Sequence, residues 1–383
     1  MCQVDLVVPL DDQSPENYKS IEPSQSLQER MANTARNQSK KIEVNLCPTQ
    51  VEGPEHPRES MKSSIDFYQR TYNADDLISL YRHTRYYVYA ICKYSLASNR
   101  VAGFCESSLG QVERLCLEPH SQWEPLPPVL VPRTKFCVAH LQRSEVLILG
   151  GKDPEGQRTD SVEVFDGQRW RPADFKLRKP RSGFALVQLE EKLVVIGGND
   201  GRVQNRVECM NLKTRHWSKL PKMNMKRDEL AACMGPDGRI YAIGGYGGGE
   251  NSCLASAERF DLKTGKWELI APMKESRRAL SAVALPDGIY AIGGYNGKEY
   301  VATVERYDIF SNEWVAVTPM RRARCTLSAV VSGDCQYIYA LGGFNGTALS
   351  SVERYDVTKD AWEEVASMQQ KRFMHACLVL GHV

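Results

Sequence analysis

Tryptophan recurs at a nearly constant interval along this chain. Successive gaps of 47, 47, 50, 47 and 48 residues separate the six tryptophans, Trp123, Trp170, Trp217, Trp267, Trp314 and Trp362. Pairs of adjacent glycines keep the same interval, at Gly150-Gly151, Gly197-Gly198, Gly244-Gly245, Gly293-Gly294 and Gly342-Gly343. Self-similarity at such a period is typical of a propeller or a solenoid array. The repeat therefore decides the fold class before any local propensity does.

Residues 280–314 show the repeating unit most clearly. Two apolar runs, 280–285 and 289–292, are joined by a Pro-Asp-Gly turn, and a diglycine, the run 304–308 and finally Trp314 follow. Each run has the length of a strand and is bounded by turn-forming residues, so we expect four short antiparallel strands per unit. A meander of four such strands is one propeller blade. The glycines permit close approach and unusual dihedral angles, and the aromatic residues supply packing area between blades.

The unit resembles the kelch repeat, in which a diglycine follows a buried strand and a Tyr-Asp pair precedes a tryptophan. The resemblance runs from about Tyr87 to the C-terminus. The third unit departs from it, since Met210-Asn211 stands in the place of the Tyr-Asp pair. The other Tyr/Phe-Asp pairs are Phe165-Asp166, Phe260-Asp261, Tyr307-Asp308 and Tyr355-Asp356.

The first unit is degenerate, and the end of the chain supplies what it lacks. In this first unit Cys92-Lys93 stands in the place of the diglycine, and no convincing first strand precedes it. The alternative to a degenerate blade is a non-blade segment that carries Trp123. Residues 374–380 look like the first strand of a further unit. We therefore expect an all-β, six-bladed kelch β-propeller over residues 86–383, with the first blade completed by 374–380. Such closure covers two sheet edges.

The N-terminal part has a different composition. Residues 1–60 hold ten acidic and six basic side chains, a net charge of −4, and contain one aromatic residue. We expect this polar tail to be disordered. Residues 61–85 are predicted to be a lead-in segment with a short helix. Many kelch proteins carry an upstream BTB domain or F-box that recruits a cullin ubiquitin ligase; the segment here is too short and polar for a BTB fold and shows no F-box pattern.

Composition indicates an intracellular protein. The chain has no 18-residue apolar run and no basic, apolar start typical of a secretory signal. Its 12 cysteines form no Cys-x-x-Cys pair, and several lie in apolar strand patterns. We expect a cytoplasmic location, with the nucleus as a further one. A net charge of +2 argues against a dedicated nucleic-acid binder, and we expect neither nucleic-acid nor membrane partners.

No catalytic motif is evident. The seven histidines form no metal-binding pattern, there is no Gly-x-Ser-x-Gly elbow, and the Gly-Lys at 297–298 lacks the spacing and the Ser or Thr of a phosphate loop. We expect no enzymatic activity and no cofactor. Kelch-type oxidases, which are secreted and bind copper through Tyr, His and Cys, are the remaining enzymatic alternative.

One charged position recurs. An arginine precedes the first strand of every unit, which would gather six basic loops on one rim; these residues are Arg133, Arg181, Arg227, Arg277, Arg324 and Arg372. This rim, together with the loops after the diglycines, resembles the surface with which kelch proteins bind a partner peptide. The arginines would then bind a short acidic or phosphorylated motif. Alternatively, they cap strands or bond neighbouring loops.

The loops after the diglycines supply three further candidate partner-binding residues. They are Tyr295, Asn296 and Asn345. Ordinary turn chemistry is the alternative explanation for such polar loop residues.

The resemblance implies a non-enzymatic protein-interaction module that binds a partner segment on the propeller rim. Its function would be that of a substrate receptor or adaptor linked to a cullin-type ubiquitin ligase, with cullin-ligase components as partners. The alternative is an actin-binding or cytoskeletal scaffold protein. The residues do not discriminate between these two functions.

Overall fold

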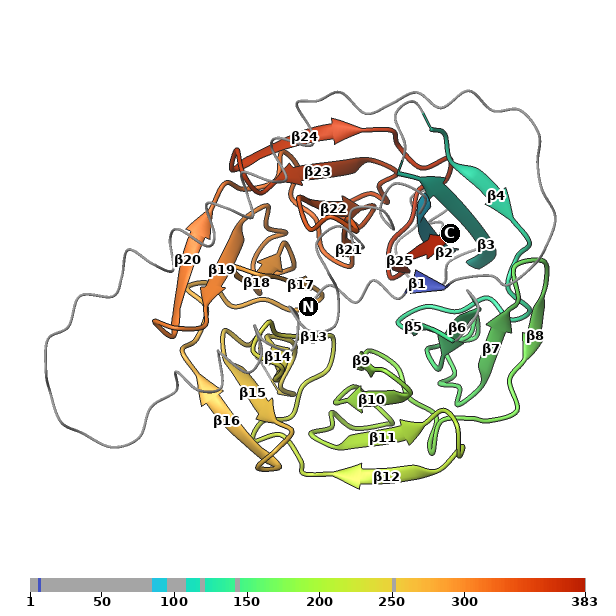
Figure 1. Cartoon of the computed structure of the whole chain (residues 1–383), viewed down its shortest axis with the longest axis horizontal. Helices are drawn as coiled ribbons and strands as arrows, with labels where there is room; N and C mark the ends of the chain where they lie inside the picture. The colour runs from blue at the N-terminus through green and yellow to red at the C-terminus, as the bar shows by residue number, and fades with distance from the viewer. Residues whose placement is uncertain are drawn as a thin grey trace, which may run out of the picture. The chain divides into compact units, whose positions relative to one another are not determined.

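A computed structural model describes residues 6–7, 85–94, 108–117, 121–141, 145–249 and 253–382. Within these ranges the chain forms six β-sheets and no helix. The sheets surround a central axis as the six blades of a propeller, as predicted (Figure 1). The predicted tail and lead-in segment, 1–60 and 61–85, lie outside the described residues apart from Leu6–Val7 and Arg85.

Blade 1 is assembled from distant parts of the chain. From the axis outwards it contains β25 (Ala376–His382), β2 (Arg85–Tyr94), β3 (Ser108–Cys116) and β4 (Glu124–Leu126). The two-residue strand β1 (Leu6–Val7) pairs in parallel with the other edge of β25.

Each remaining blade is a meander of four consecutive strands, which follow one another from the axis outwards. Blade 2 comprises β5 (Cys137–His140), β6 (Val146–Leu149), β7 (Val162–Phe165) and β8 (Trp170–Pro172). Blade 3 comprises β9 (Ala185–Leu189), β10 (Lys192–Ile196), β11 (Val207–Asn211) and β12 (Trp217–Leu220). Blade 4 comprises β13 (Ala231–Met234), β14 (Ile240–Ile243), β15 (Ala257–Asp261) and β16 (Lys266–Ile270). Blade 5 comprises β17 (Ser281–Leu285), β18 (Gly288–Ile292), β19 (Val304–Asp308) and β20 (Glu313–Val317). Blade 6 comprises β21 (Ser328–Val331), β22 (Tyr337–Leu341), β23 (Val352–Asp356) and β24 (Ala361–Val365).

The C-terminal strand closes the propeller, and the degenerate first unit is a blade. Strand β25 pairs antiparallel with β2, from Ala376 opposite Ile91 to His382 opposite Arg85. The closing strand begins two residues later than the predicted 374–380, because Met374 has a left-handed φ of 52° and cannot continue an extended strand. Where the first blade lacks a diglycine, the pairing of β2 with β3 shifts register between Ile91 and Lys93.

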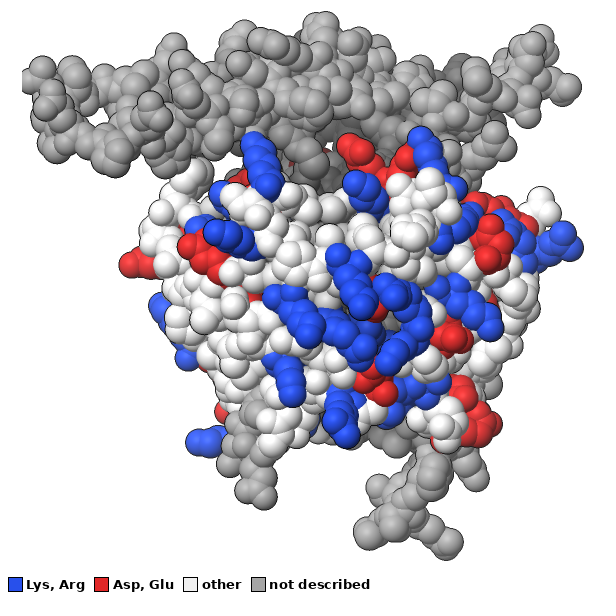
Figure 2. All heavy atoms as spheres, turned by 90° about the horizontal axis from the view of Figure 1, so that it is seen from below, with Lys and Arg blue, Asp and Glu red and all other residues white. Residues whose placement is uncertain are grey.

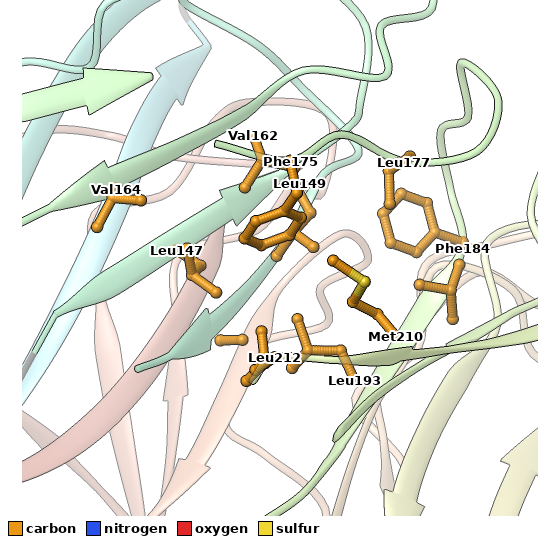
Figure 3. Close-up of a cluster of buried hydrophobic side chains, with 12 residues drawn as sticks. Leu147, Leu149, Val162, Val164, Phe175, Leu177, Phe184, Leu193, Met210 and Leu212 are labelled. Atoms are coloured by element: carbon orange, nitrogen blue, oxygen red, sulfur yellow. The ribbon is translucent and has the colours of Figure 1, made fainter. Parts of the chain in front are cut away.

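The hydrophobic core lies between neighbouring blades. The second strands are mostly apolar and buried on both faces; β6 is an example, and so is β10 after its exposed first residue, Lys192. Figure 3 shows the cluster that joins blades 2 and 3, where Leu149 of β6, Leu193 of β10 and Met210 of β11 point toward one another. Six clusters of this kind, one at each junction, hold the described part of the ring together.

The tryptophans connect each blade to the segment that leads into it, which confirms their predicted role between blades. In blade 5, the Trp314 ring packs 5.1 Å from the Tyr307 ring, and its Nε1–H donates to the carbonyl oxygen of Ala271 at 2.8 Å. The other five tryptophans make the same type of indole hydrogen bond.

The diglycines allow one blade to approach the next closely. Gly293 and Gly294 have φ angles of 60° and 109°, and a Cβ on Gly293 would lie 2.5 Å from the carbonyl oxygen of Arg324. The N–H of Gly294 donates to that same oxygen at 2.9 Å. Only glycine combines these dihedral angles with this contact at low cost.

A closed ring of backbone hydrogen bonds surrounds the propeller axis. One residue per blade contributes, and in each case its N–H donates to the carbonyl oxygen of its counterpart in the preceding blade, over N–O distances of 2.7 to 3.3 Å. All six residues are left-handed, with φ between 51° and 63°. We call this set the axial ring; it comprises Lys135, Gly183, Glu229, Ala279, Thr326 and Met374.

Candidate functional site

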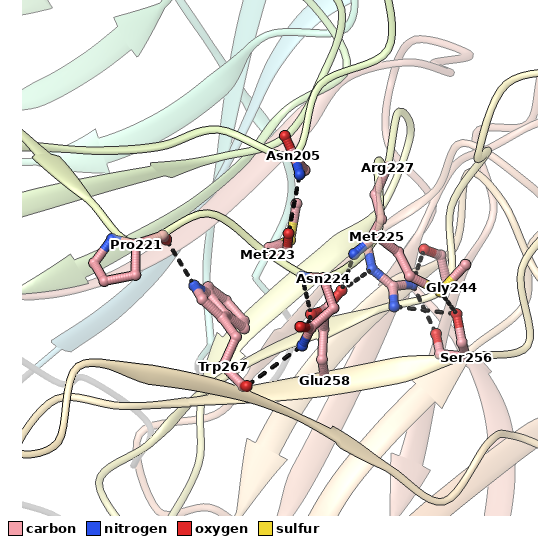
Figure 4. A network of polar contacts seen from close by, with 10 residues as sticks. All are labelled: Asn205, Pro221, Met223, Asn224, Met225, Arg227, Gly244, Ser256, Glu258 and Trp267. Atoms are coloured by element: carbon pink, nitrogen blue, oxygen red, sulfur yellow. Dashed lines mark hydrogen bonds and ion pairs between the residues drawn. The ribbon is translucent and has the colours of Figure 1, made fainter.

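The six repeated arginines are buried. Each side chain lies just ahead of its blade's innermost strand, with 0 to 1% of the residue exposed. In blade 4, Arg227 donates from Nη1 to the carbonyl oxygens of Gly244 and Ser256, at 2.8 Å each, and forms an ion pair with Glu258 at 3.0 Å (Figure 4). Equivalent arginine–glutamate pairs occur in the other five blades.

The glutamate partners form a second repeated set. They lie on the third strand of each blade, two positions before the Tyr-Asp site, at Glu113, Glu163, Glu208, Glu258, Glu305 and Glu353. Glu258 also accepts backbone N–H groups from Asn224 at 2.7 Å and Met225 at 3.2 Å. Four other glutamates accept two such bonds, whereas Glu208 faces the Arg178 guanidinium at 3.6 Å.

This geometry favours a structural role for the arginines. Burial lowers the pKa of Arg227 and of Arg324 from the usual arginine value, and the partner glutamates oppose that shift. The donors are directed at carboxylates and carbonyl oxygens of their own blades. The sequence left open whether the arginines bind a partner or instead cap strands or bond neighbouring loops, and these contacts support the second, structural interpretation.

The three predicted loop residues occupy different environments. Asn296 forms the turn itself, because its Oδ1 accepts the N–H groups of Lys298 and Glu299 at 2.9 Å each. Asn345 is exposed and bonds only within its own turn, to Thr347, among the contacts described. Tyr295 is half-buried and lies beside the axial ring, since it bridges to Arg278, which precedes Ala279.

Tyr295 belongs to a continuous line of aromatic residues. Its ring centroid lies 5.6 Å from that of Tyr300, which meets Phe344 edge-on at 5.6 Å, and Phe344 lies 5.2 Å from Phe373. The Arg278 guanidinium lies over the rings of Tyr295, at 5.1 Å, and Tyr246, at 5.7 Å. We call this set the aromatic arc; it comprises Tyr246, Arg278, Tyr295, Tyr300, Phe344 and Phe373 and spans blades 4, 5, 6 and 1.

The arc can be recognised in the sequence once the blades are aligned. The residue after the diglycine is aromatic in blades 4, 5 and 6, where it is Tyr246, Tyr295 and Phe344, whereas blades 2 and 3 have Lys152 and Asn199. Toward blades 2 and 3 the axial ring is charged, since Lys135 of blade 2 pairs with Glu229 at the edge of blade 4. The surface around the axis therefore has an aromatic half and a polar half.

Metal-ligating side chains do not gather into a site in the ranges that the structure describes, where no group of three or more His, Cys, Asp or Glu has a metal-binding arrangement. No helix among the described residues has the length and apolar character needed to cross a membrane. Cys116, Cys137, Cys209, Cys233, Cys253, Cys325 and Cys377 are free thiols, and burial raises the pKa of Cys233 and of Cys377 to about 12.

Comparison with known proteins gives consistent matches. The family model for the KLHDC2/KLHL20/DRC7 Kelch-repeats domain matches residues 117–274 and 183–383. Kelch-like protein 41a of Danio rerio is 26% identical over 187 residues, which cover 48% of this chain and 31% of that protein. The F-box/kelch-repeat protein At1g26930 of Arabidopsis thaliana is 34% identical over 125 residues, covering 30% of each chain. Kelch repeat and BTB domain-containing protein F47D12.7 of Caenorhabditis elegans is 32% identical over 177 residues, covering 43% of this chain and 30% of that protein.

The match therefore spans less than one third of the length of these relatives. Together the two matches of the family model cover residues 117–383, which hold the six tryptophans, the five diglycines and most of the six-bladed ring. By fold, repeat and family model together, the chain belongs to the kelch-repeat family.

Proposed function

We propose that this protein is a substrate receptor or adaptor for a cullin-type ubiquitin ligase, and that its propeller holds a partner segment on the surface around the axis. The aromatic arc is the observation that carries this proposal. Tyrosine and arginine are enriched among the residues that dominate binding energy at protein interfaces. Tyr246, Tyr295, Tyr300 and Phe344 are half-buried, so they retain exposed surface for contact with a partner.

The arc also indicates what a partner segment needs. An apolar or aromatic side chain would pack on Tyr295 and Phe344, and an acidic or phosphorylated residue would face Arg278, which is half-buried between two rings. The acidic motif expected from the repeated arginines is thus proposed to meet a different arginine. The ligase role is supported by the names of two relatives, which combine kelch repeats with an F-box or a BTB domain.

Affinity capture from cell lysate tests the proposal. The tagged chain is compared with Tyr295→Ala/Phe344→Ala, and with Phe310→Ala as the control, because Phe310 is 82% exposed in the turn between β19 and β20, outside the arc. Immunoblots score cullin and actin. We expect cullin with all three chains, and loss of the co-captured, ubiquitinated substrates from the arc variant alone.

The alternative function gives the opposite pattern. If the chain captures actin without cullin and sediments with purified actin filaments, it is a cytoskeletal protein and the ligase proposal is wrong. If all three chains capture the same substrates, the partner binds away from the aromatic arc.

A further inference from the structure

The outer wall of blade 3 gathers exposed cationic side chains. Figure 2, which views the propeller from the side of blades 3 and 4, shows Lys and Arg concentrated across the middle of this wall. We call this set the basic wall; it comprises exposed cations of β12 and of the connections before, within and after blade 3, namely Lys176, Lys179, Arg202, Lys219, Lys222 and Lys226.

The charge of the chain is concentrated here. Residues 176–226 hold 12 Lys and Arg against 4 Asp and Glu, a net charge of +8, whereas the whole chain has +2. The acidic groups nearby already have partners, since Glu208 pairs with Arg181 and Asp200 with Arg206. Within the part of the chain that the structure describes, no ion pair involves a basic-wall side chain. The wall therefore presents uncompensated positive charge.

The repeat shows that this charge is specific to blade 3. Lysine occurs at the second position after the tryptophan in blade 3 alone; the six residues there are Pro125, Pro172, Lys219, Leu269, Ala316 and Glu364. Lys222 likewise replaces the proline of blades 1, 4 and 5. The outermost strands β4, β16, β20 and β24 each carry a glutamate, which β12 lacks. An anionic partner would thus meet negative charge on most other blades.

Protection of a sheet edge explains part of this pattern. A lysine on an outermost strand such as β12 discourages edge-to-edge association. Lys219 alone would serve that purpose. The remaining five cations lie in the β8–β9, β10–β11 and β12–β13 connections, where no sheet edge needs protection.

We propose that the basic wall is a docking surface for an acidic polypeptide segment, separate from the aromatic arc. Complementary charge accelerates and orients such an encounter. A nucleic acid fits less well: no exposed Phe, Tyr or Trp lies in the described part of blade 3 to stack on bases, and the positive charge covers one blade of a nearly neutral chain. A short Asp/Glu-rich segment needs no more than this one blade.

Fluorescence anisotropy with a labelled peptide of alternating Glu and Gly tests the proposal, with duplex DNA and single-stranded RNA as competing probes. The wall variant is Lys219→Glu/Lys222→Glu/Lys226→Glu. Its control, Lys263→Glu/Lys266→Glu/Lys298→Glu, makes the same charge change at exposed lysines of blades 4 and 5. Thermal melting verifies that both remain folded.

We expect the full chain to bind the peptide with a Kd that rises with salt. The wall variant should raise this Kd about tenfold more than the control variant does. Tyr295→Ala/Phe344→Ala should bind the peptide normally, which separates this inference from the proposed function. Absence of peptide binding by the full chain, or equal loss in wall and control variants, overturns the proposal. Tighter, wall-dependent binding of DNA or RNA would replace the acidic polypeptide with nucleic acid.

Discussion

The guanidinium groups of the repeated arginines have almost no contact with water, so each depends on the oxygen atoms that its own blade provides. Arg277 donates to the carbonyl oxygens of Gly293 and Thr303 and pairs with Glu305 at 3.0 Å. The arginine thereby joins the start of the innermost strand to the second and third strands. Its loss leaves a buried carboxylate without its main counter-charge.

We expect Arg277→Ala to lower the free energy of unfolding by about 3–5 kcal/mol, the usual effect of removing one partner of a buried ion pair. The neighbouring Arg278→Ala is the control: Arg278 is half-buried and we expect a loss of about 1 kcal/mol. Urea unfolding followed by tryptophan fluorescence measures both. Equal midpoints for Arg277→Ala and the unmodified chain would show that the arginine is not structural.

The spacing of these arginines was evident from the sequence, but their environment was not. Periodicity shows that Arg277 and Arg324 occupy equivalent positions around the axis. It does not give the direction in which they point. Glu305 and Glu353 recur with the same period, and a buried carboxylate at that position is the signal that would have favoured a structural role.

His375 is a buried base at a position that is otherwise apolar. The residue after the axial-ring residue is Phe or Leu in the other five blades, at Phe136, Phe184, Leu230, Leu280 and Leu327. Burial, with lesser contributions from Arg372 and Arg324, lowers the pKa of His375 to about 3. In the unfolded chain the imidazole titrates near a pKa of about 6.5. The unfolded state therefore binds the proton first as pH falls.

Above about pH 6.5 His375 therefore does not reduce the free energy of unfolding. Below that pH it lowers this free energy progressively, down to about pH 3. At pH 5 the loss is about 2 kcal/mol relative to pH 7.5. We expect His375→Leu to remove this part of the pH dependence, measured as urea midpoints at the two pH values. His216→Gln, which replaces an exposed histidine, is the control substitution.

At the scale of the elements, β25 is the strand on which closure depends. It provides the innermost strand of blade 1, and the segment leading into it carries Arg372, the partner of Glu113. The closing strand was predictable because residues 374–380 repeat an apolar pattern that the first unit lacks. The residue at which β25 begins was not predictable. The left-handed turn at Met374 arises from the axial ring, which is a contact between blades that the local sequence does not show.

We expect a chain that ends at Gln370 to be insoluble or to melt at a much lower temperature. Deletion exposes the inner edge of β2 and leaves Glu113 buried without its arginine. Circular dichroism melting and sedimentation measure the effect. A synthetic peptide of residues 371–383 should restore solubility in trans, and a truncated chain that melts like the full chain would contradict the closure.

At the scale of the whole molecule, the axial ring links all six blades through one continuous set of hydrogen bonds. Five of its members are not glycine, although a left-handed residue with a side chain costs about 1–2 kcal/mol. The ring recurs with the blade period at Lys135, Glu229, Ala279 and Thr326, which have little in common chemically. Backbone geometry, not side-chain identity, specifies the ring, so it could not be predicted from residue types.

We expect Ala279→Gly to raise the free energy of unfolding by about 0.5–1 kcal/mol, because glycine adopts φ of 52° without a steric penalty. Gly183→Ala should be destabilising, since its Cβ would lie 2.1 Å from Oδ1 of Asp228. Ala316→Gly, in the extended strand β20, is the control and should cost about 0.5–1 kcal/mol. A loss of stability in Ala279→Gly would show that its left-handed conformation carries no penalty.

The closing strand also has a consequence for synthesis of the protein. Strand β2 begins at Arg85 and its inner partner β25 begins at Ala376, 291 positions later. At translation rates of about 5–20 residues per second, the inner edge of β2 waits roughly 15–60 s for its partner. During that time blades 2 to 6 can form on the ribosome while blade 1 stays incomplete. The nascent chain thus carries an open edge throughout the synthesis of blades 2 to 6, and this is the stage at which a chaperone would be of most use.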